Sequence, residues 1–188
     1  MVLASSNDES SWLIELYVWT SKRFYLLCGV PFGIERKVRE KMNKRLIYTI
    51  GFENKSQEEF LHQLMRNGVG LVIDVRLNNC SEKDGYATFP TISNLLEHES
   101  IIYKNDRMLA PDDQIRQNYK RNADWTEYTG GFHKLMAQRN IHIYIRQNYL
   151  QEESVICLMC KEADSTACHR SLVAQYFASV LDADVINL

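Results

Sequence analysis

Long apolar runs and a paired set of cysteines are both missing from this sequence. No stretch reaches the roughly 18 apolar residues that span a bilayer, because the apolar segment 12–30 is broken by Ser21, Lys22 and Arg23. The basic start and small-residue cleavage site of a signal peptide are also lacking. The five cysteines are odd in number, which fits reduced thiols better than a disulfide framework. We therefore expect a cytoplasmic protein that does not enter a membrane.

A strong charge of either sign is absent as well. The chain has 22 Lys and Arg against 24 Asp and Glu, which gives a formal net charge of −2. This balance offers no extended positive surface to duplex nucleic acid or to an anionic membrane, although it leaves room for a small basic pocket. Neither a Walker phosphate loop nor a Gly-x-Gly-x-x-Gly turn is present, so nucleoside triphosphates and dinucleotides are not indicated. We expect no cofactor.

The residues that are present suffice for one domain, since the chain has 188 residues of which 45% are hydrophobic. The pattern changes abruptly at Leu46, so we divide the chain into an N-terminal appendage, residues 1–45, and a single α/β domain, residues 46–188. The appendage is expected to be partly helical or disordered, with residues 10–41 largely helical and outside the main sheet. A poorly packed stretch that follows from an upstream start codon is the alternative.

Continuous apolar runs predict strands that are buried on both faces. These runs are LIYTIGF at 46–52, VGLVIDVR at 69–76, SVICLMC at 154–160 and ADVINL at 183–188. A capping box of Ser56 and Glu59 begins one helix, and an apolar stripe predicts another over 172–181. The middle region predicts a strand at 101–103 and helices near 92–98, 114–120 and 128–139. Alternating strands and helices predict a three-layer α/β fold, with a mostly parallel sheet and helices on both faces.

Reactive side chains follow the carboxyl ends of three predicted strands. Gly51 ends the first, Asp74 and Arg76 end the second, and Cys160 ends the third. Ligands of open parallel sheets bind at this edge, so we expect Asp74, Arg76, Cys160 and Arg170 to approach one another there. Because the sequence Cys168-His169-Arg170 lies at a predicted helix N-terminus, the helix dipole favours anions and lowers thiol pKa values.

These residue types suggest a catalytic set. Cys160 or Cys168 would be the nucleophile or reactive thiol, His169 a proton carrier, and Asp74 or Glu162 its orienting carboxylate. Arg76 and Arg170 have forked donors that suit phosphate or carboxylate. Each residue also has a structural interpretation: Asp74 and Arg76 form a strand-end ion pair, Cys160 is a core thiol, and His169 caps a helix.

Asp74 ends a fully apolar strand, so its carboxylate needs a cationic or hydrogen-bonding partner. We predict that Asp74 contacts Arg170 or His169 directly, with Arg76 as one further candidate partner. Such a contact would fix the arginine for an incoming anion.

A zinc site is not expected, although Cys157, Cys160, Cys168 and His169 superficially suggest one. Strand residues three apart point to opposite faces of a sheet, so Cys157 and Cys160 do not converge. The adjacent Cys168-His169 pair also lacks the usual separation of zinc ligands. Cys157 is therefore interpreted as a buried core thiol.

Three segments together resemble the domain of unknown function 488 family, in its longer form, over about residues 46–188. They are YTIGFENKSQEEFLHQLMRNGVGLVIDVRLNN, YKNDRMLAPDDQIRQNYKRNADWTEY and LMCKEADSTACHRSLVAQY. The resemblance implies signature positions at Tyr48, Gly51, Asp74, Arg76, Cys160, Glu162, Cys168, His169 and Arg170, with Tyr48 and Gly51 on the ligand side. It marks Ser81, Tyr103, Leu109, Ala110, Pro111, Tyr119, Trp125 and Tyr128 as belonging to the longer form. Family members often end in His-Leu, whereas this chain ends in Asn187-Leu188.

The family name implies no reaction, so three functional hypotheses stay open. The first is a thiol-dependent enzyme acting on an anionic, nucleotide-like or nucleic-acid-derived substrate. The second is a non-catalytic anion-binding or sensor module that uses the same pocket. The third is a protein-interaction domain that docks through the aromatic segment containing Trp12, Tyr17, Trp19 and Phe24. The sequence does not indicate an oligomeric state.

Overall fold

The computed structural model describes residues 16–20, 23–27, 44–152 and 154–188. In the N-terminal unit, strands β1 (Leu16–Thr20) and β2 (Arg23–Leu27) pair antiparallel. The helix predicted over 10–41 is therefore wrong for these ten residues, in which β-branched and aromatic side chains favour an extended chain. The rest of that prediction, including Trp12 of the proposed docking segment, lies outside the described residues.

The second unit, Lys44–Leu188, is built on a five-stranded sheet in which every neighbouring pair is parallel. The strands are β3 (Arg45–Gly51), β4 (Val69–Asp74), β5 (Ile102–Asn105), β6 (Val155–Cys160) and β7 (Ala183–Asn187). Their spatial order is β5-β4-β6-β3-β7, so β6 and β3 are central. Central strands are covered on both faces, which explains why their sequences are continuously apolar.

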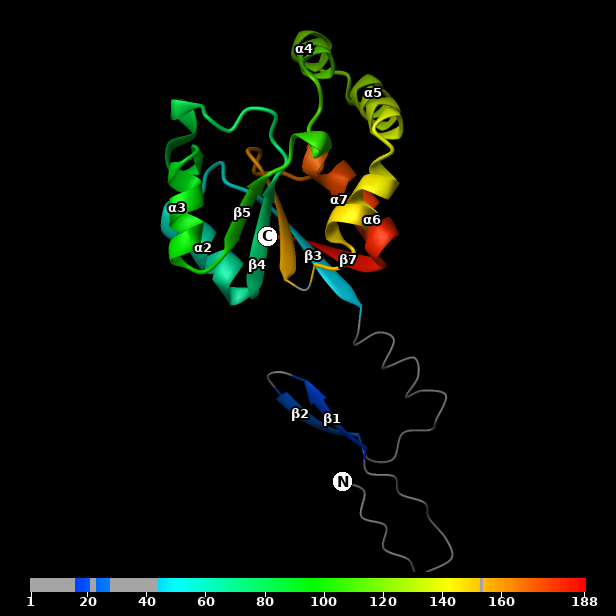
Figure 1. Cartoon of the computed structure of the whole chain (residues 1–188). Helices are drawn as coiled ribbons and strands as arrows, with labels where there is room; N and C mark the ends of the chain where they lie inside the picture. Colours follow the sequence, from blue (N-terminus) through cyan, green and yellow to red (C-terminus); the bar gives the residue numbers. More distant parts are fainter. Residues whose placement is uncertain (1–15, 21–22, 28–43, 153) are drawn as a thin grey trace, which may run out of the picture. The chain divides into compact units, whose positions relative to one another are not determined.

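Six helices of this unit surround the sheet and complete the predicted three-layer α/β fold (Figure 1). They are α2 (Gln57–Arg66), α3 (Thr91–His98), α4 (Asp113–Asn122), α5 (Trp125–Gln138), α6 (Ile141–Tyr149) and α7 (His169–Leu181). Helices α2 and α3 cover one face and α6 and α7 the other, while α4 and α5 lie beyond the carboxyl ends of the strands (Figure 1). Two short 3₁₀ turns, Glu82–Ala87 and Arg107–Leu109, complete the loops at that end.

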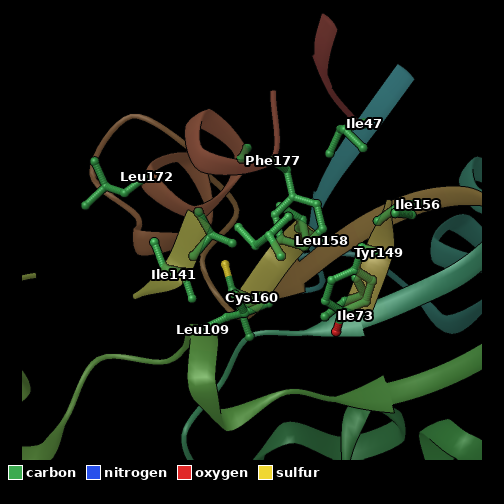
Figure 2. Packing of buried hydrophobic residues seen from close by; sticks show 14 of the residues in the cluster. Ile47, Ile73, Leu109, Ile141, Tyr149, Ile156, Leu158, Cys160, Leu172 and Phe177 are labelled. Carbon is green, nitrogen blue, oxygen red and sulfur yellow. The ribbon is translucent and has the colours of Figure 1, made fainter. Parts of the chain in front are cut away.

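Side chains of β6 show how the sheet separates two cores. Ile156, Leu158 and Cys160 pack with α5, α6 and α7, as Figure 2 shows for part of that core. Cys157 and Met159 pack on the opposite face, with α2 and α3. This alternation is the period of two that a strand imposes. The prediction that Cys157 and Cys160 do not converge is confirmed.

Helix α6 was not predicted from the sequence. Its segment, IHIYIRQNY, alternates apolar and polar residues at first, and Asn140 before it provides no side-chain cap and has a left-handed φ of 50°. Tertiary contacts stabilise the helix instead. Two hydroxyl groups of the helix donate to the buried carboxylate of Asp106: the hydroxyl of Tyr149 at 2.5 Å and the hydroxyl of Tyr144 at 2.8 Å. Long-range hydrogen bonds of this kind leave no local sequence signal.

No helix in the described ranges combines the length and apolarity needed to cross a membrane.

Gly51 allows the loop after β6 to approach the end of β3. Gly51 pairs with Cys160 in the sheet register. A Cβ atom at Gly51 would overlap the carbonyl oxygen of Glu162 and lie 2.9 Å from Nη1 of Arg170. The absence of a side chain is therefore a packing requirement at this position.

We predict that Gly51→Ala lowers the free energy of unfolding by about 3 kcal/mol, because the loop carrying Glu162 must move to accept the methyl group. Chemical denaturation measures this change. Gly130→Ala is the matched control, since Gly130 lies inside α5 and a Cβ there has nothing within 4 Å. That substitution should stabilise the protein by roughly 0.5–1 kcal/mol. Equal stability of the two variants would contradict the close packing at Gly51.

Candidate functional site

Three segments meet at the carboxyl edge of the sheet. Asp74 at the end of β4 pairs in register with Met159 of β6, and the amide of Val75 donates to the carbonyl of Met159 at 3.0 Å. Cys160 ends β6 beside Gly51 of β3. Asp74, Arg76, Cys160 and Arg170 thus lie at one edge of the sheet, as the parallel topology requires.

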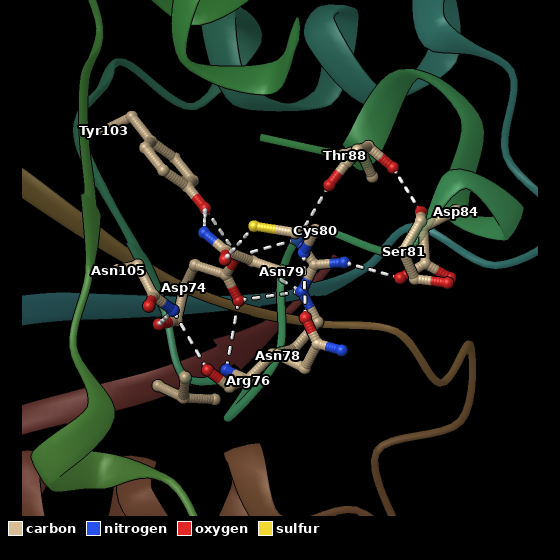
Figure 3. A network of polar contacts seen from close by, with 12 residues as sticks. Asp74, Arg76, Asn78, Asn79, Cys80, Ser81, Asp84, Thr88, Tyr103 and Asn105 are labelled. Atoms are coloured by element: carbon tan, nitrogen blue, oxygen red, sulfur yellow. Dashed lines mark hydrogen bonds and ion pairs between the residues drawn. The ribbon is translucent and has the colours of Figure 1, made fainter. Parts of the chain in front are cut away.

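Asp74 forms a buried bidentate ion pair with Arg76 (Figure 3). Its carboxylate accepts from Nη2 of Arg76 at 2.7 Å and from Nε at 2.9 Å. The hydroxyl of Tyr103 donates to the same carboxylate at 2.6 Å. Burial, together with the nearby Asp74 charge, raises the pKa of Tyr103 beyond its usual range, so Tyr103 stays a donor.

Arg76 is fixed by the protein itself. Besides Asp74, its guanidinium donates to Asp84 at 3.0 Å and to the carbonyl of Ala87 at 2.7 Å. It also stacks over the ring of Phe52 at 4.8 Å. Arg76 is 6% exposed, so it forms part of the pocket wall while most of its donors are already used.

The predicted contact of Asp74 with Arg170 or His169 is wrong. Asp74 alternates along β4 with Ile73 and Val75, which pack in the α7-side core. Its carboxylate therefore points to the opposite face, towards Tyr103 and Arg76 (Figure 3). The imidazole Nε2 of His169 instead lies 3.0 Å from the carbonyl oxygen of Val75.

Arg170 is buried beneath the loop that follows β6, with 1% of its surface exposed. Its Nη1 donates to Sγ of Cys160 at 2.8 Å and to the carbonyl of Glu162. Its Nη2 donates to the carbonyl of Ala163 at 3.0 Å, and Nε lies 3.4 Å from Oγ1 of Thr49. Within the described ranges, none of its partners is a carboxylate.

Cys168 and Cys160 bring their sulfur atoms together next to Arg170. The Sγ atoms are 2.9 Å apart, and Cys168 Sγ is 3.2 Å from Oε2 of Glu162. Cys168 is also the N-cap of α7, where its sulfur accepts from the amide of Arg170 at 3.5 Å. A sulfur in this position faces exposed amides and the positive end of the helix dipole.

The pKa values of the two thiols are shifted in opposite directions. The hydrogen bond from the Cys160 thiol lowers the pKa of Cys168 to about 6, with His169 adding to the effect against the opposing influence of burial. Burial and the same hydrogen bond raise the pKa of Cys160 well above its usual value. We therefore describe the pair as a Cys168 thiolate that accepts a hydrogen bond from a protonated Cys160.

His169 lies beside Cys168, and its pKa is raised. Its Nδ1 lies 4.0 Å from Cys168 Sγ, while Nε2 is held by the carbonyl of Val75. Burial lowers the pKa of His169, but the neighbouring Cys168 and Glu162 outweigh it and raise the pKa overall. The geometry suits an imidazolium that donates from Nε2 to the backbone and keeps a proton on Nδ1.

Tyr48 does not join this cluster, because it alternates with Thr49 and packs in the α2- and α3-side core. Thr49 takes its place on the α7 face and links Arg170 to the last strand, since its hydroxyl donates to Oδ1 of Asn187 at 2.6 Å. Asn187, where relatives often carry histidine, thus reaches the cluster through one intermediate residue.

A pocket of about 430 Å³ opens above Cys168 and His169, within the size range of small-molecule sites. One wall is aromatic: Trp125 stacks on Tyr128 with ring centroids 4.9 Å apart, and Tyr119 meets both rings edge-on. These side chains come from α4 and α5, beyond the strand ends.

Cations around the pocket are residues that sequence reasoning did not select. Arg116, Lys120 and Lys161 line it, together with the acidic Asp84 and Glu162. Lys161 also donates to Asp84 at 3.0 Å. One sequence feature could have indicated these pocket residues: Arg116 and Lys120 are one helical turn apart, and Lys120 is next to an aromatic residue.

Cys160, Glu162 and Cys168 place one ligand atom each within 4.8 Å of one another, so they could hold a metal ion. The guanidinium of Arg170, 2.8 Å from Cys160 Sγ, already provides a positive charge at that point. A metal would have to share Cys160 with this cation.

We predict that Asp74→Asn lowers the free energy of unfolding by about 3 kcal/mol or more, because it leaves the Arg76 guanidinium buried without its counter-charge. Urea denaturation measures the loss. The control is Asp113→Asn, whose side chain is 75% exposed in its pair with Arg116. It should change stability by less than about 0.5 kcal/mol. If Asp74→Asn lowered the free energy of unfolding as little as Asp113→Asn does, the buried ion pair would be unimportant for stability.

Comparison with known proteins identifies the family of this chain. No curated protein and no solved structure matches the chain. A family model described as "Domain of unknown function DUF488" matches residues 56–177, which include α2 to α6, the larger part of α7 and most of the site. Because this match extends over more than half of the sequence, the chain belongs to the DUF488 family.

Proposed function

We propose that this protein is a thiol-dependent enzyme that acts on an anionic, nucleotide-like substrate, with Cys168 as its nucleophile. The observation that carries the proposal is the position of the Cys168 sulfur, at the N-terminus of α7 and in the lining of a pocket that has both cations and stacked aromatic rings. Cys160 is completely buried and protonated, so it supports the nucleophile from beneath.

The surroundings of Arg170 are compatible with a thiolate at Cys168. A guanidinium buried as deeply as that of Arg170 requires a nearby negative charge or a full set of acceptors. Its neighbours are backbone carbonyls, one hydroxyl and the two sulfur atoms. The carboxylate of Glu162, whose pKa is lowered, supplies negative charge near Arg170, and a thiolate at Cys168 adds to it.

The pocket suits a planar ring joined to a phosphate or carboxylate. Trp125, backed by Tyr128, offers an aromatic face for stacking, and Lys161, Arg116 and Lys120 offer positive charge. In the reaction, Cys168 Sγ bonds to the electrophilic atom of the substrate, the bond to the leaving group breaks, and Nδ1 of His169 gives its proton to that group. Water then cleaves the thio-adduct, which returns the thiolate and the His169 proton.

We predict that iodoacetamide alkylates Cys168 at a rate that rises as the pH passes through about 6 and levels off above about 7. The thiolate is the reacting form, and a lowered pKa moves its titration to lower pH. Free cysteine, with a pKa of about 8.5, should still be accelerating at pH 8. Peptide mass spectrometry at each pH gives the profile.

Two variants control that profile. Cys160→Ala removes the hydrogen bond to Cys168, so the midpoint should move to higher pH. Cys160→Ser keeps a donor and should move it less. If unmodified Cys168 follows the profile of free cysteine, the proposed nucleophile is wrong.

We also predict that adenosine 5′-monophosphate protects Cys168 from alkylation at least tenfold, while adenosine or inorganic phosphate alone protects less. Each of the two provides only one of the interactions, stacking or charge, that the pocket offers. Trp125→Ala and Lys161→Ala should each weaken the protection. Lys83→Ala, at an exposed position outside the pocket lining, is the control and should not.

Protection with no turnover of any nucleotide would favour the binding or sensor module instead. In that case Cys168→Ser should bind as tightly as the unmodified protein, because the pocket walls are unchanged. Equal alkylation with and without all three probes would contradict both hypotheses.

A further inference from the structure

We propose that Cys160 and Cys168 form a reversible disulfide when a hydroperoxide enters the pocket, with Cys160 as the resolving thiol. This inference rests on the proposed function only in using the same Cys168 thiolate. It assigns Cys160 a chemical role that the nucleophilic reaction does not require.

Geometry supports the pairing. The two Sγ atoms lie 2.9 Å apart on the same face of the sheet. A disulfide requires about 2.05 Å, so the sulfur atoms must approach by less than about 1 Å. Side-chain rotation can provide this movement, because Cys160 ends β6 and Cys168 lies at the start of α7, joined by a short loop.

Access to the two sulfur atoms differs in the way that a resolving pair needs. Cys168 is 2% exposed but contributes to the pocket lining, so a small oxidant in the pocket meets it before Cys160. Cys160 is fully buried behind it and does not line the pocket. Cys157, three residues earlier, packs on the other face of the sheet, and burial raises its pKa far above the usual range. Cys157 is therefore a natural control.

The chemistry takes two steps. The Cys168 thiolate attacks the terminal oxygen of the hydroperoxide and the O–O bond breaks. Cys168 becomes a sulfenic acid. The other half of the peroxide takes a proton and leaves as an alcohol, or as water when the oxidant is hydrogen peroxide. Sγ of Cys160 then attacks the sulfenic sulfur and loses its proton, and the hydroxyl leaves as water. Two electrons pass from the thiols to the peroxide, and an external thiol restores both cysteines by exchange.

The consequence for the site is the loss of its nucleophile and of the negative charge beside Arg170. The disulfide also stops oxidation of Cys168 before the irreversible sulfinic stage. The same pocket is therefore active when reduced and inactive but recoverable when oxidised.

The test treats the reduced full chain with hydrogen peroxide and blocks remaining thiols with N-ethylmaleimide. Trypsin then cuts after Arg146, Lys161 and Arg170, which places Cys160 on peptide 147–161 and Cys168 on peptide 162–170. We expect a cross-linked pair of these peptides that lacks two hydrogens and disappears after dithiothreitol. Cys157→Ala, which removes the other cysteine of peptide 147–161, should give the same pair.

Cys160→Ser should give no cross-link, and its Cys168 should proceed to sulfinic acid. Three results would overturn the inference: sulfinic acid at Cys168 without a cross-link in the unmodified chain, a cross-link that persists in Cys160→Ser, or a divalent metal retained in native mass spectra with both thiols unreactive. Fast alkylation of Cys168 without a cross-link overturns this inference alone. A cross-link combined with slow alkylation leaves the dithiol pair in place and overturns the proposed nucleophile.

Discussion

The buried guanidinium of Arg170 is the interaction on which the site depends. It joins β3 through Thr49, β6 through Cys160, and the loop before α7 through two carbonyls. Gly51 leaves the space in which this loop lies. Within the described residues its donors contact backbone carbonyls, one hydroxyl and the two sulfur atoms, so in this structure Arg170 holds these segments in position. The sulfur atoms are part of its acceptor set, while the acidity of Cys168 comes from the Cys160 hydrogen bond and from His169.

The fold could be predicted closely from the sequence because β3, β4 and β6 are interior, apolar strands and most of the helices have local signals. Continuous apolar runs placed β3, β4, β6 and β7, and the capping box of Ser56 and Glu59 placed the start of α2. Helix α6 escaped, since its stability comes from Asp106, some 40 residues earlier in the chain. Prediction failed where the deciding contact is distant along the sequence, and succeeded where periodicity or capping decides.

Within the site, the sequence predicted correctly which edge of the sheet carries the reactive residues. The predicted contact of Asp74 with Arg170 or His169 was wrong. Counting residues along β4 places Asp74 on the face opposite Val75, and the register places Cys160 beside Val75. The alternation along β4 can be counted in the sequence, but the register and the face that Arg170 occupies are known only from the fold. The pocket walls that α4 and α5 form could not be predicted from the sequence. Tertiary packing sets the path of the chain that places Trp125 and Lys120 over the strand ends, and no local sequence pattern indicates that path.

Helix α4 contains no buried residue and packs on α5, yet it contributes Arg116, Tyr119 and Lys120 to the pocket. A helix with so little buried surface opens locally at a lower free energy than the sheet does. Each opening removes two cations and one aromatic ring from the pocket at once. Ligand affinity and the local stability of α4 are therefore reciprocally linked, and a ligand that touches both α4 and the strand edge slows amide hydrogen exchange throughout that helix.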